Sequence, residues 1–269
     1  MIISADSNDV DYEYSGQSDY TPNDYQQMMG TSMSTPHVSG LAALIVEALA
    51  GWNWTKAEAL KVKMIISMTA FEVQGGEEDN VPPLNRGAKD NVEGYGQICA
   101  DAAIEAATMT YTVGELATDV FGSDPSDKKV WARQVSLWAN NEYEFHLSVP
   151  SGADYDLYLY NGTPDAYGQP VILAKSINAS VGAEEAIRYT PTLSGTRYIL
   201  VKWVSGSGSF HLESTTEHDV GVVSVTPSVW EAYESNTVNI TVSVKNHGGA
   251  LETFNVTVYI EDTPLENQT

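Results

Sequence analysis

The hydrophobic pattern of this chain changes its period near residue 110. Before that point, apolar residues recur at helical spacing, as in Val38, Leu41 and Ile45. After it, apolar and polar residues alternate, as in Tyr143, Phe145 and the residues that follow. A period near 3.6 predicts helices and a period of two predicts strands. The sequence therefore predicts a helical N-terminal region that is joined to an all-β remainder.

Three helices are expected in the N-terminal region. The first follows the capping residues Ser34 and Thr35, with Pro36 in its first turn. The second starts at Thr55, where Glu58 lies three residues later and predicts a capping box. The third covers residues 97–107. A polar loop that contains Gly and Pro, residues 74–90, separates the last two helices.

The all-β remainder divides into two expected modules. Short alternating runs separated by turn clusters, such as Asn161-Gly162-Thr163, predict an antiparallel sandwich over residues 108–216. Runs at 220–225, 238–244 and 254–260 predict most of an immunoglobulin-like module over residues 217–269, with no clear final strand. Residues 1–107 form the remaining unit, so the sequence predicts a multi-domain chain.

The charge balance excludes two classes of partner. Among 269 residues, 36 are Asp or Glu and 13 are Lys or Arg, which gives a formal net charge of −23. A nucleic acid or an anionic membrane surface would repel such a chain. The longest apolar-rich run, residues 37–52, is interrupted by Gly40 and Glu47 and is too short to span a bilayer. Cys99 is the only cysteine, which excludes an internal disulfide and a Cys-rich zinc site.

One segment carries a clear chemical signal, the run Gly30-Thr31-Ser32-Met33-Ser34-Thr35-Pro36-His37-Val38-Ser39-Gly40. Ser32 is expected just ahead of a helix, where its hydroxyl is exposed and its amide lies near the positive end of the helix dipole. This arrangement suits a nucleophile whose own N–H stabilises an oxyanion. Gly30 removes side-chain bulk where a substrate would approach.

The same segment resembles the active-site serine segment of the subtilisin-like serine peptidases, the subtilases. Ile2-Ile3-Ser4-Ala5 is similar to the strand that precedes this serine, and Gly94-Tyr95-Gly96 with Ala102-Ala103 is similar to the end of the peptidase domain. The resemblance implies that Ser32 is the catalytic nucleophile. It also implies that residues 1–107 are the C-terminal part of an α/β domain with a parallel sheet and helices.

The rest of the subtilase machinery is missing from the sequence. In that family Asp and then His precede the serine, and an Asn between His and Ser completes the oxyanion hole. No histidine precedes Ser32, and the D-[ST]-G and H-G-T segments are absent. The acidic residues between Asp6 and Asp24 lie in a loop-like tract. The histidines that follow Ser32 are not expected to act as its base: His37, His146, His211, His218 and His247. The chain alone is therefore expected to be inactive.

The β regions have resemblances of their own. Asp154-Tyr155-Asp156-Leu157-Tyr158-Leu159-Tyr160 and Ser194-Gly195-Thr196-Arg197-Tyr198-Ile199 resemble the bacterial pre-peptidase C-terminal domain, a sandwich attached to secreted peptidases. Val242-Ser243-Val244-Lys245-Asn246-His247-Gly248 is similar to CARDB-type adhesion modules. These resemblances imply an extracellular or cell-surface location. They also leave room for a carbohydrate, protein or cell-surface ligand of the β modules.

No cofactor is required by the expected chemistry, and no metal ligands are assigned. Asp154 and Asp156 share a strand face, and Glu77-Glu78-Asp79 is an acidic cluster, so a structural Ca²⁺ site is one interpretation. A solvated acidic surface is the favoured one on a chain of this charge.

The leading functional hypothesis is a C-terminal fragment of a secreted subtilisin-like endopeptidase that acts on proteins or peptides, in which the start at Met1 reflects truncation. The alternative is a non-catalytic extracellular binding or adhesion protein that carries a peptidase remnant. A third hypothesis has a separate chain supply the Asp and His. In any of these cases we expect the first helix to expose Leu41, Leu44, Ile45 and Leu49, and residues 1–107 to be marginally stable.

Overall fold

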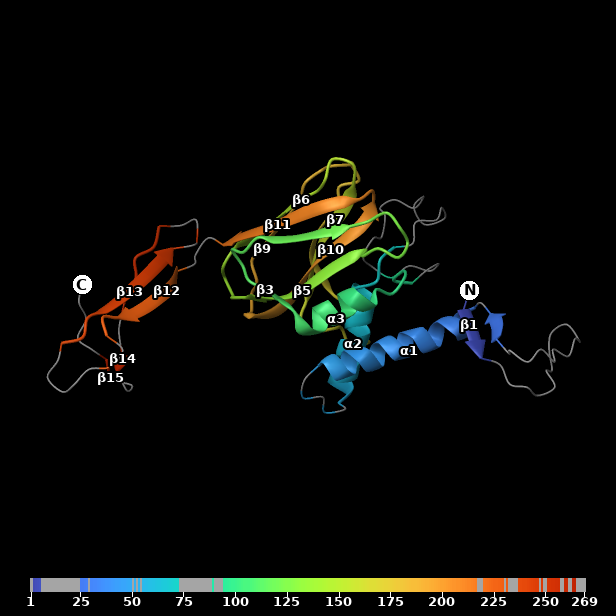
Figure 1. The fold of residues 1–269 in the computed structure, drawn as a ribbon, viewed down its shortest axis with the longest axis horizontal. Helices are drawn as coiled ribbons and strands as arrows, with labels where there is room; N and C mark the ends of the chain where they lie inside the picture. The colour runs from blue at the N-terminus through green and yellow to red at the C-terminus, as the bar shows by residue number, and fades with distance from the viewer. Residues whose placement is uncertain are drawn as a thin grey trace, which may run out of the picture.

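The structure is a computed structural model that describes residues 2–5, 25–28, 30–49, 51, 53, 55–72, 89, 94–216, 220–229, 231, 237–246, 248, 251–256, 259–260 and 263–264. Three helices precede a two-sheet sandwich, and short two-stranded sheets lie toward both ends of the chain (Figure 1). None of the described helices is long and apolar enough to cross a membrane.

The three expected helices are present, with shifted starts. They are α1 (Thr31–Ala48), α2 (Lys56–Met68) and α3 (Ala100–Thr108). The predicted capping box is confirmed, because Thr55 accepts from the Glu58 amide and the Glu58 carboxylate accepts from the Thr55 amide at 3.0 Å. The third helix begins at Ala100, not at residue 97, because Gln97 forms a β-bridge with Phe71. A side chain at Gly96 would collide with the Phe71 carbonyl, so this approach requires glycine.

The sandwich consists of two antiparallel sheets, apart from one short parallel pair. The five-stranded sheet has the order β3-β5-β10-β7-β8, and β3 runs parallel to β5. Its strands are β3 (Thr110–Tyr111), β5 (Val130–Leu137), β7 (Asp154–Asn161), β8 (Ile172–Ser176) and β10 (Gly195–Ser205). The four-stranded sheet, β4-β11-β6-β9, consists of β4 (Ala117–Phe121), β6 (Tyr143–Ser148), β9 (Glu185–Tyr189) and β11 (Gly208–Thr216).

The inner core of the sandwich follows the predicted alternation. On β6, Tyr143, Phe145 and Leu147 are buried, and the residues between them are half-buried. They pack against Leu157 and Val201 from the facing sheet, as is usual when two sheets stack face to face. Phe121, Tyr155 and Phe210 add edge-on and tilted ring contacts at centroid separations of 5.0–6.1 Å.

The five-stranded sheet is buried on both faces, which the alternation did not predict. The helices cover its outer face (Figure 1), and one core cluster contains Met64 and Ala103 from the helices together with Tyr158 and Leu200 from the strands. As a result, β7 is buried along nearly its whole length. Alternation reports the period of a strand but not whether another layer covers its second face.

Polar contacts also join the helices to this sheet. Arg133 of β5 and Lys128 both pair with Glu105 of α3, at 2.7 and 2.6 Å. The Gln134 amide donates to the Ala106 carbonyl at 2.9 Å, and the Lys63 ammonium of α2 donates to the Tyr167 carbonyl at 2.7 Å. Both apolar and polar side chains of α2 and α3 therefore contact the sandwich.

The expected exposure of the first helix is wrong for two of its four residues. Leu41 is 3% exposed and Ile45 is fully buried, whereas Leu44 is 51% exposed and Leu49 is half-buried. Leu41 and Ile45 belong to the same core cluster as the buried residues of α2 and α3. The apolar face of α1 therefore finds a partner within the chain, and its first ten residues, 31–40, remain largely exposed.

The N-terminal strand is confirmed, but its partner differs from the expected one. Residues Ile2–Ala5 form β1, which pairs antiparallel with β2 (Tyr25–Met28). The described residues do not form the parallel sheet that the subtilase resemblance implies. Among the described helices, α3 packs against β5, and α1 packs on α2 and α3 within the same core cluster.

The C-terminal region contains part of the expected strand pattern. Strand β12 (Val220–Pro227) pairs antiparallel with β13 (Ile240–Asn246). The expected third strand, 254–260, is reduced to β14 (Tyr259–Ile260), which pairs with β15 (Thr263–Pro264). Within the described part, Val222, Val223 and Val225 remain 56–61% exposed, as expected of a two-stranded ribbon without a facing sheet.

Candidate active-site serine

Ser32 is the second residue of α1, not a residue ahead of the helix as the sequence predicted. The helix begins at Thr31 because the Gly30 carbonyl accepts from both the Met33 and Ser34 amides, at 3.0 and 3.1 Å. Pro36 consequently lies inside the helix. At this position the proline ring removes the amide that would donate to the Ser32 carbonyl and crowds that carbonyl, and the helix nevertheless continues through it.

Gly30 sets the direction in which the chain enters the helix. Its φ of 144° and ψ of 174° belong to a region that is open to glycine and strained for other residues. No atom lies within 4 Å of a side chain built at this position, so the requirement for glycine comes from the backbone angle alone. Ser32 therefore follows a turn that only glycine adopts without strain.

Neighbouring hydroxyls in this segment donate hydrogen bonds to carbonyls of the preceding helical turn. Thr35 donates to the Thr31 carbonyl at 2.8 Å, and Ser34 and Ser39 make similar bonds to carbonyls four residues earlier, at 3.3 and 3.1 Å. Ser32 is exposed, and within the described part of the chain no hydrogen bond engages its hydroxyl. It is thus the serine of this segment whose oxygen is presented to solvent.

The electrostatic setting of Ser32 favours negative charge. Amides in the first turn of a helix lack intrahelical acceptors, and the helix dipole is positive at that end. The first turn of α1 contains no acidic residue that would offset this potential. An oxyanion formed on a carbonyl that the Ser32 oxygen attacks could therefore accept a hydrogen bond from the Ser32 amide.

The described histidines do not approach Ser32 as bases. His37 lies on α1 itself, where its Nδ1 bonds to the Met33 carbonyl at 2.9 Å. His146 pairs with Glu184 at 3.3 Å, and His211 bonds to Thr118 at 3.1 Å. These last two lie on β6 and β11, in the four-stranded sheet, whereas the helices cover the outer face of the other sheet.

Two further sets of residues named from the sequence lie outside the described ranges. They are the acidic tract from Asp6 to Asp24 and the histidines His218 and His247. A serine needs a base within hydrogen-bond reach to become a nucleophile. The described part of the chain presents a candidate nucleophile and one candidate oxyanion donor, and places no base beside them.

The two carboxylates weighed as calcium ligands are not surface groups. Asp154 and Asp156 are 7% and 1% exposed, so the expected solvated acidic surface is wrong at this strand. Asp156 accepts from the Tyr158 hydroxyl at 2.9 Å and lies opposite Lys202 in the sheet. Over the described ranges, no group of three or more His, Cys, Asp and Glu side chains could hold a metal ion. Glu77-Glu78-Asp79 lies outside those ranges.

Sequence reasoning missed a second candidate site, a groove at one end of the sandwich that includes Trp138, Asn141 and Thr216. Thr216 is distant in sequence from Trp138 and Asn141 and is brought near them by the pairing of β11 with β6. The sequence feature that could have indicated this groove is the polar turn directly after Trp138, because an exposed tryptophan beside a turn often marks a binding surface.

Comparison with known proteins gives one family match and several structural likenesses. Residues 4–96 match the model of the subtilase family, Peptidase_S8, a stretch that includes Ser32 and α2. The pre-peptidase C-terminal domain of a collagenase from Bacillus anthracis is similar to this chain at 10% identity and a TM-score of 0.31, covering 40% of this chain and 93% of that domain.

Two periplasmic inhibitors of g-type lysozyme, both PliG proteins, show a similar degree of likeness. The protein from Aeromonas hydrophila is 14% identical with a TM-score of 0.27, and the one from Salmonella Typhimurium is 11% identical with a TM-score of 0.26. Each likeness covers 40% of this chain and 97% of the other.

Proposed function

We propose that this chain carries the nucleophile segment of a subtilisin-like serine endopeptidase and that Ser32 is the nucleophile. The observation that carries the proposal is the exposed Ser32 hydroxyl at the start of α1, after a strained glycine, within the stretch that matches the subtilase family. Protein or peptide substrates and an extracellular location are part of this proposal.

The proposed reaction is acyl transfer. The Ser32 oxygen attacks a peptide carbonyl while a histidine accepts the serine proton, and the Ser32 amide stabilises the resulting oxyanion. Protonation of the leaving amine by the same histidine breaks the peptide bond and leaves an acyl-enzyme, which water then hydrolyses. The histidine, its orienting Asp and an oxyanion Asn are proposed to come from outside the described residues.

A complementation experiment tests the assignment of Ser32. The chain is co-expressed with, or fused to, a subtilase segment that contains the Asp, His and Asn motifs, and hydrolysis of a chromogenic peptide and labelling by a fluorophosphonate are measured. We expect both activities to appear in the complemented chain and to be lost in Ser32→Ala. Ser34→Ala is the matched control, because its hydroxyl is bonded within the helix.

The isolated 269-residue chain should not react with the fluorophosphonate above the level of Ser32→Ala. Stoichiometric labelling of Ser32 in the isolated chain would contradict the proposal that its base lies elsewhere. Hydrolysis by the complemented chain that survives Ser32→Ala would contradict the nucleophile assignment itself.

A non-catalytic binding protein that carries a peptidase remnant is the second candidate function. The shared core of α1–α3 and the sandwich favours it, since these helices are committed to packing against a β module. The CARDB-like assignment of residues 217–269 is proposed together with either candidate. An in-frame stop shortly upstream of Met1 in the nucleotide sequence would favour it, and an open frame that encodes the Asp and His motifs would favour the peptidase.

A further inference from the structure

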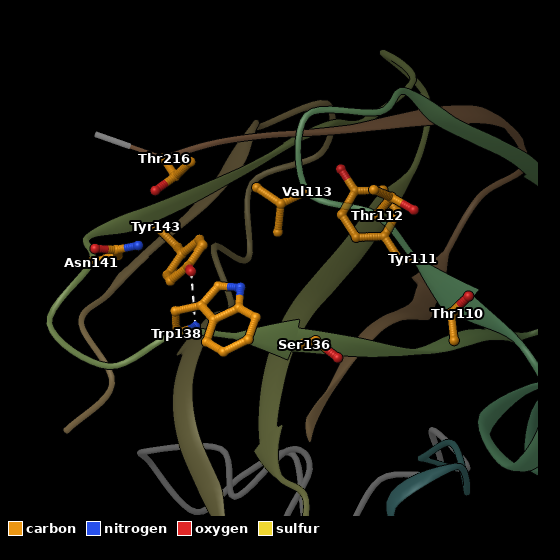
Figure 2. A pocket seen from close by; sticks show the side chains of 9 residues that line it. All are labelled: Thr110, Tyr111, Thr112, Val113, Ser136, Trp138, Asn141, Tyr143 and Thr216. Carbon is orange, nitrogen blue, oxygen red and sulfur yellow. Dashed lines mark hydrogen bonds between the residues drawn. The ribbon is translucent and has the colours of Figure 1, made fainter. Parts of the chain in front are cut away.

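A groove of about 380 Å³ lies at one end of the sandwich, between the start of β3 and the turn that connects β5 to β6 (Figure 2). The ring of Trp138 lies along this groove and is 66% exposed. Tyr111 and Tyr143 line it from the core side, where both are almost fully buried. The remaining polar lining residues are Thr110, Thr112, Ser136, Asn141 and Thr216.

The turn that carries Trp138 is held in place by three consecutive backbone amides. The Trp138 amide donates to the Tyr143 hydroxyl at 2.9 Å, as Figure 2 shows, and the Ala139 amide donates to the Ser194 hydroxyl at 2.9 Å. The Asn140 amide donates to the Pro191 carbonyl at 2.8 Å, and Asn140 has a positive φ of 63°. Because the backbone of this turn is already held, only the side-chain torsions of Trp138 remain to be ordered when a ligand binds.

The wall of the groove that Tyr111 forms is also held in place by hydrogen bonds. The Tyr111 hydroxyl lies 2.7 Å from both the Glu115 carbonyl and the Ser214 hydroxyl, and the Gly114 amide donates to that same serine at 3.1 Å. The Tyr111 ring meets Trp131 edge-on at 6.2 Å. Both walls of the groove are therefore anchored in the sandwich core.

Thr216 provides an observation that points to a ligand. It is the last residue of β11, opposite Tyr143 in the sheet, and it is only 7% exposed. Its hydroxyl oxygen is buried and, within the part of the chain that the structure describes, has no hydrogen-bond partner. A buried hydroxyl without a partner is destabilising, so such groups call for an explanation. Because Thr216 lines the groove, rotation of its side chain toward the groove would let a ligand hydroxyl supply the missing bond.

The groove contains no charged side chain among its described lining residues, although the chain carries a net charge of −23. Among these described residues an anionic ligand would find no cation, and a cationic ligand no carboxylate. The lining instead offers hydroxyls, an amide and an aromatic face. A neutral ligand that is rich in hydroxyl groups matches all three.

We propose that this groove binds a neutral saccharide, with a sugar ring stacked on Trp138 and a sugar hydroxyl bonded to Thr216. A sugar ring has an apolar C–H face for the indole and equatorial hydroxyls for Thr112 and Asn141. A bound peptide is a poorer fit. Extended peptides dock by main-chain pairing with a free sheet edge, and the edge strand here, β3, has only two residues.

Binding is tested on the full chain with three neutral hexasaccharides: cellohexaose, maltohexaose and N-acetylchitohexaose. Titration calorimetry measures affinity, and the indole N–H resonance of Trp138, assigned by its loss in Trp138→Phe, reports the site. We expect at least one hexasaccharide to bind saturably and to shift this resonance. Trp138→Ala should weaken binding at least tenfold, and Thr216→Val, which keeps the shape and removes the hydroxyl, severalfold.

Tyr167→Ala is the matched control, because Tyr167 is 72% exposed and lies outside the groove lining. Its affinity should equal that of the unmodified chain. The proposal is overturned if none of the three hexasaccharides binds or if Trp138→Ala binds as well as the unmodified chain. It is also overturned if a neutral proline-rich peptide, but no saccharide, binds in a Trp138-dependent manner. None of these outcomes bears on Ser32.

Discussion

The ammonium of Lys202 on β10 donates a hydrogen bond of 2.7 Å to the carbonyl of Ala70, which follows α2. Lys202 is 5% exposed and lies near the rings of Tyr158 and Tyr160, with ring centroids at 5.4 and 5.8 Å. A lysine of the sandwich thus donates to a backbone carbonyl within residues 4–96, the stretch that matches the subtilase family. This bond lies inside the core that the helices share with the sandwich.

The first prediction concerns the pH dependence of stability through Lys202. Burial lowers the pKa of Lys202 to about 8, against the opposing effects of Glu72, Cys99 and Asp156. Above that pH the unfolded chain holds the proton that the folded chain has released, so this group makes stability rise with pH. Between pH 7.5 and 9 we expect a gain of about 1 kcal/mol in the free energy of unfolding, measured by urea titration.

Lys202→Met is the comparison variant, and its stability should lack this rise. The upper limit of pH 9 keeps the experiment below the range where the buried tyrosines would titrate in the unfolded chain. Both proteins carry Cys99→Ala, because an unfolded cysteine has a pKa of about 8.5 and would oppose the trend within this range. Parallel pH profiles for the two proteins would contradict the prediction.

The second prediction uses Cys99 as a probe of the shared core. Burial, with a smaller effect from Asp101, raises the pKa of the Cys99 thiol to about 12. At pH 8 we expect its reaction with Ellman's reagent to be about 100-fold slower in the folded chain than in urea. As urea increases, reactivity should appear at the same midpoint as the loss of the near-ultraviolet circular dichroism of the sandwich aromatics. Reactivity at a clearly lower midpoint would mean that the helices unfold independently.

The third prediction separates two neighbouring residues of α1. Ile45 is fully buried, while Leu44 is 51% exposed. Ile45→Ala should destabilise the chain by about 2–4 kcal/mol, because it leaves a cavity between α1 and the other helices. Leu44→Ala, in the same helix, should cost less than about 1 kcal/mol. Equal losses of stability in the two variants, measured by thermal or urea unfolding, would contradict the burial of Ile45 in this core.

The fourth prediction concerns how much the buried Thr216 hydroxyl lowers the free energy of unfolding. Because this hydroxyl is buried without a partner among the described residues, replacing it by a methyl group removes an unfavourable interaction without changing side-chain shape. Thr216→Val should raise the free energy of unfolding by about 1 kcal/mol in the absence of ligand. A loss of stability of the same size would show that the hydroxyl has a partner in the folded protein.

Several local features could be predicted from the sequence because they depend on near neighbours. The Thr55 capping box needs only Glu58 three residues later, and the burial of Phe145 and Leu147 needs only alternation. The position of Ser32 near a helix start follows from Gly30 and the apolar residues after it, although the helix begins earlier than Ser34 because Gly30 itself caps it.

The features that could not be predicted depend on residues far apart in the chain. Leu41 and Ile45 were expected to be exposed because the sequence does not tell which surface a helix meets. Asp156 was expected at a solvated surface because the chain is strongly acidic, yet the helices bury that face of its strand. The groove could not be predicted because Thr216 and Trp138 come together only through the pairing of β11 with β6.

The sequence by itself determined the period of each segment, the helix caps and the presence of a subtilase-like serine segment, because these are carried by residues within about one helical turn or strand of each other. Only the tertiary structure decided that the helices cover the sandwich and that an uncharged groove forms at its end. Both depend on which apolar and polar surfaces meet, and that choice is made by burial summed over the whole chain.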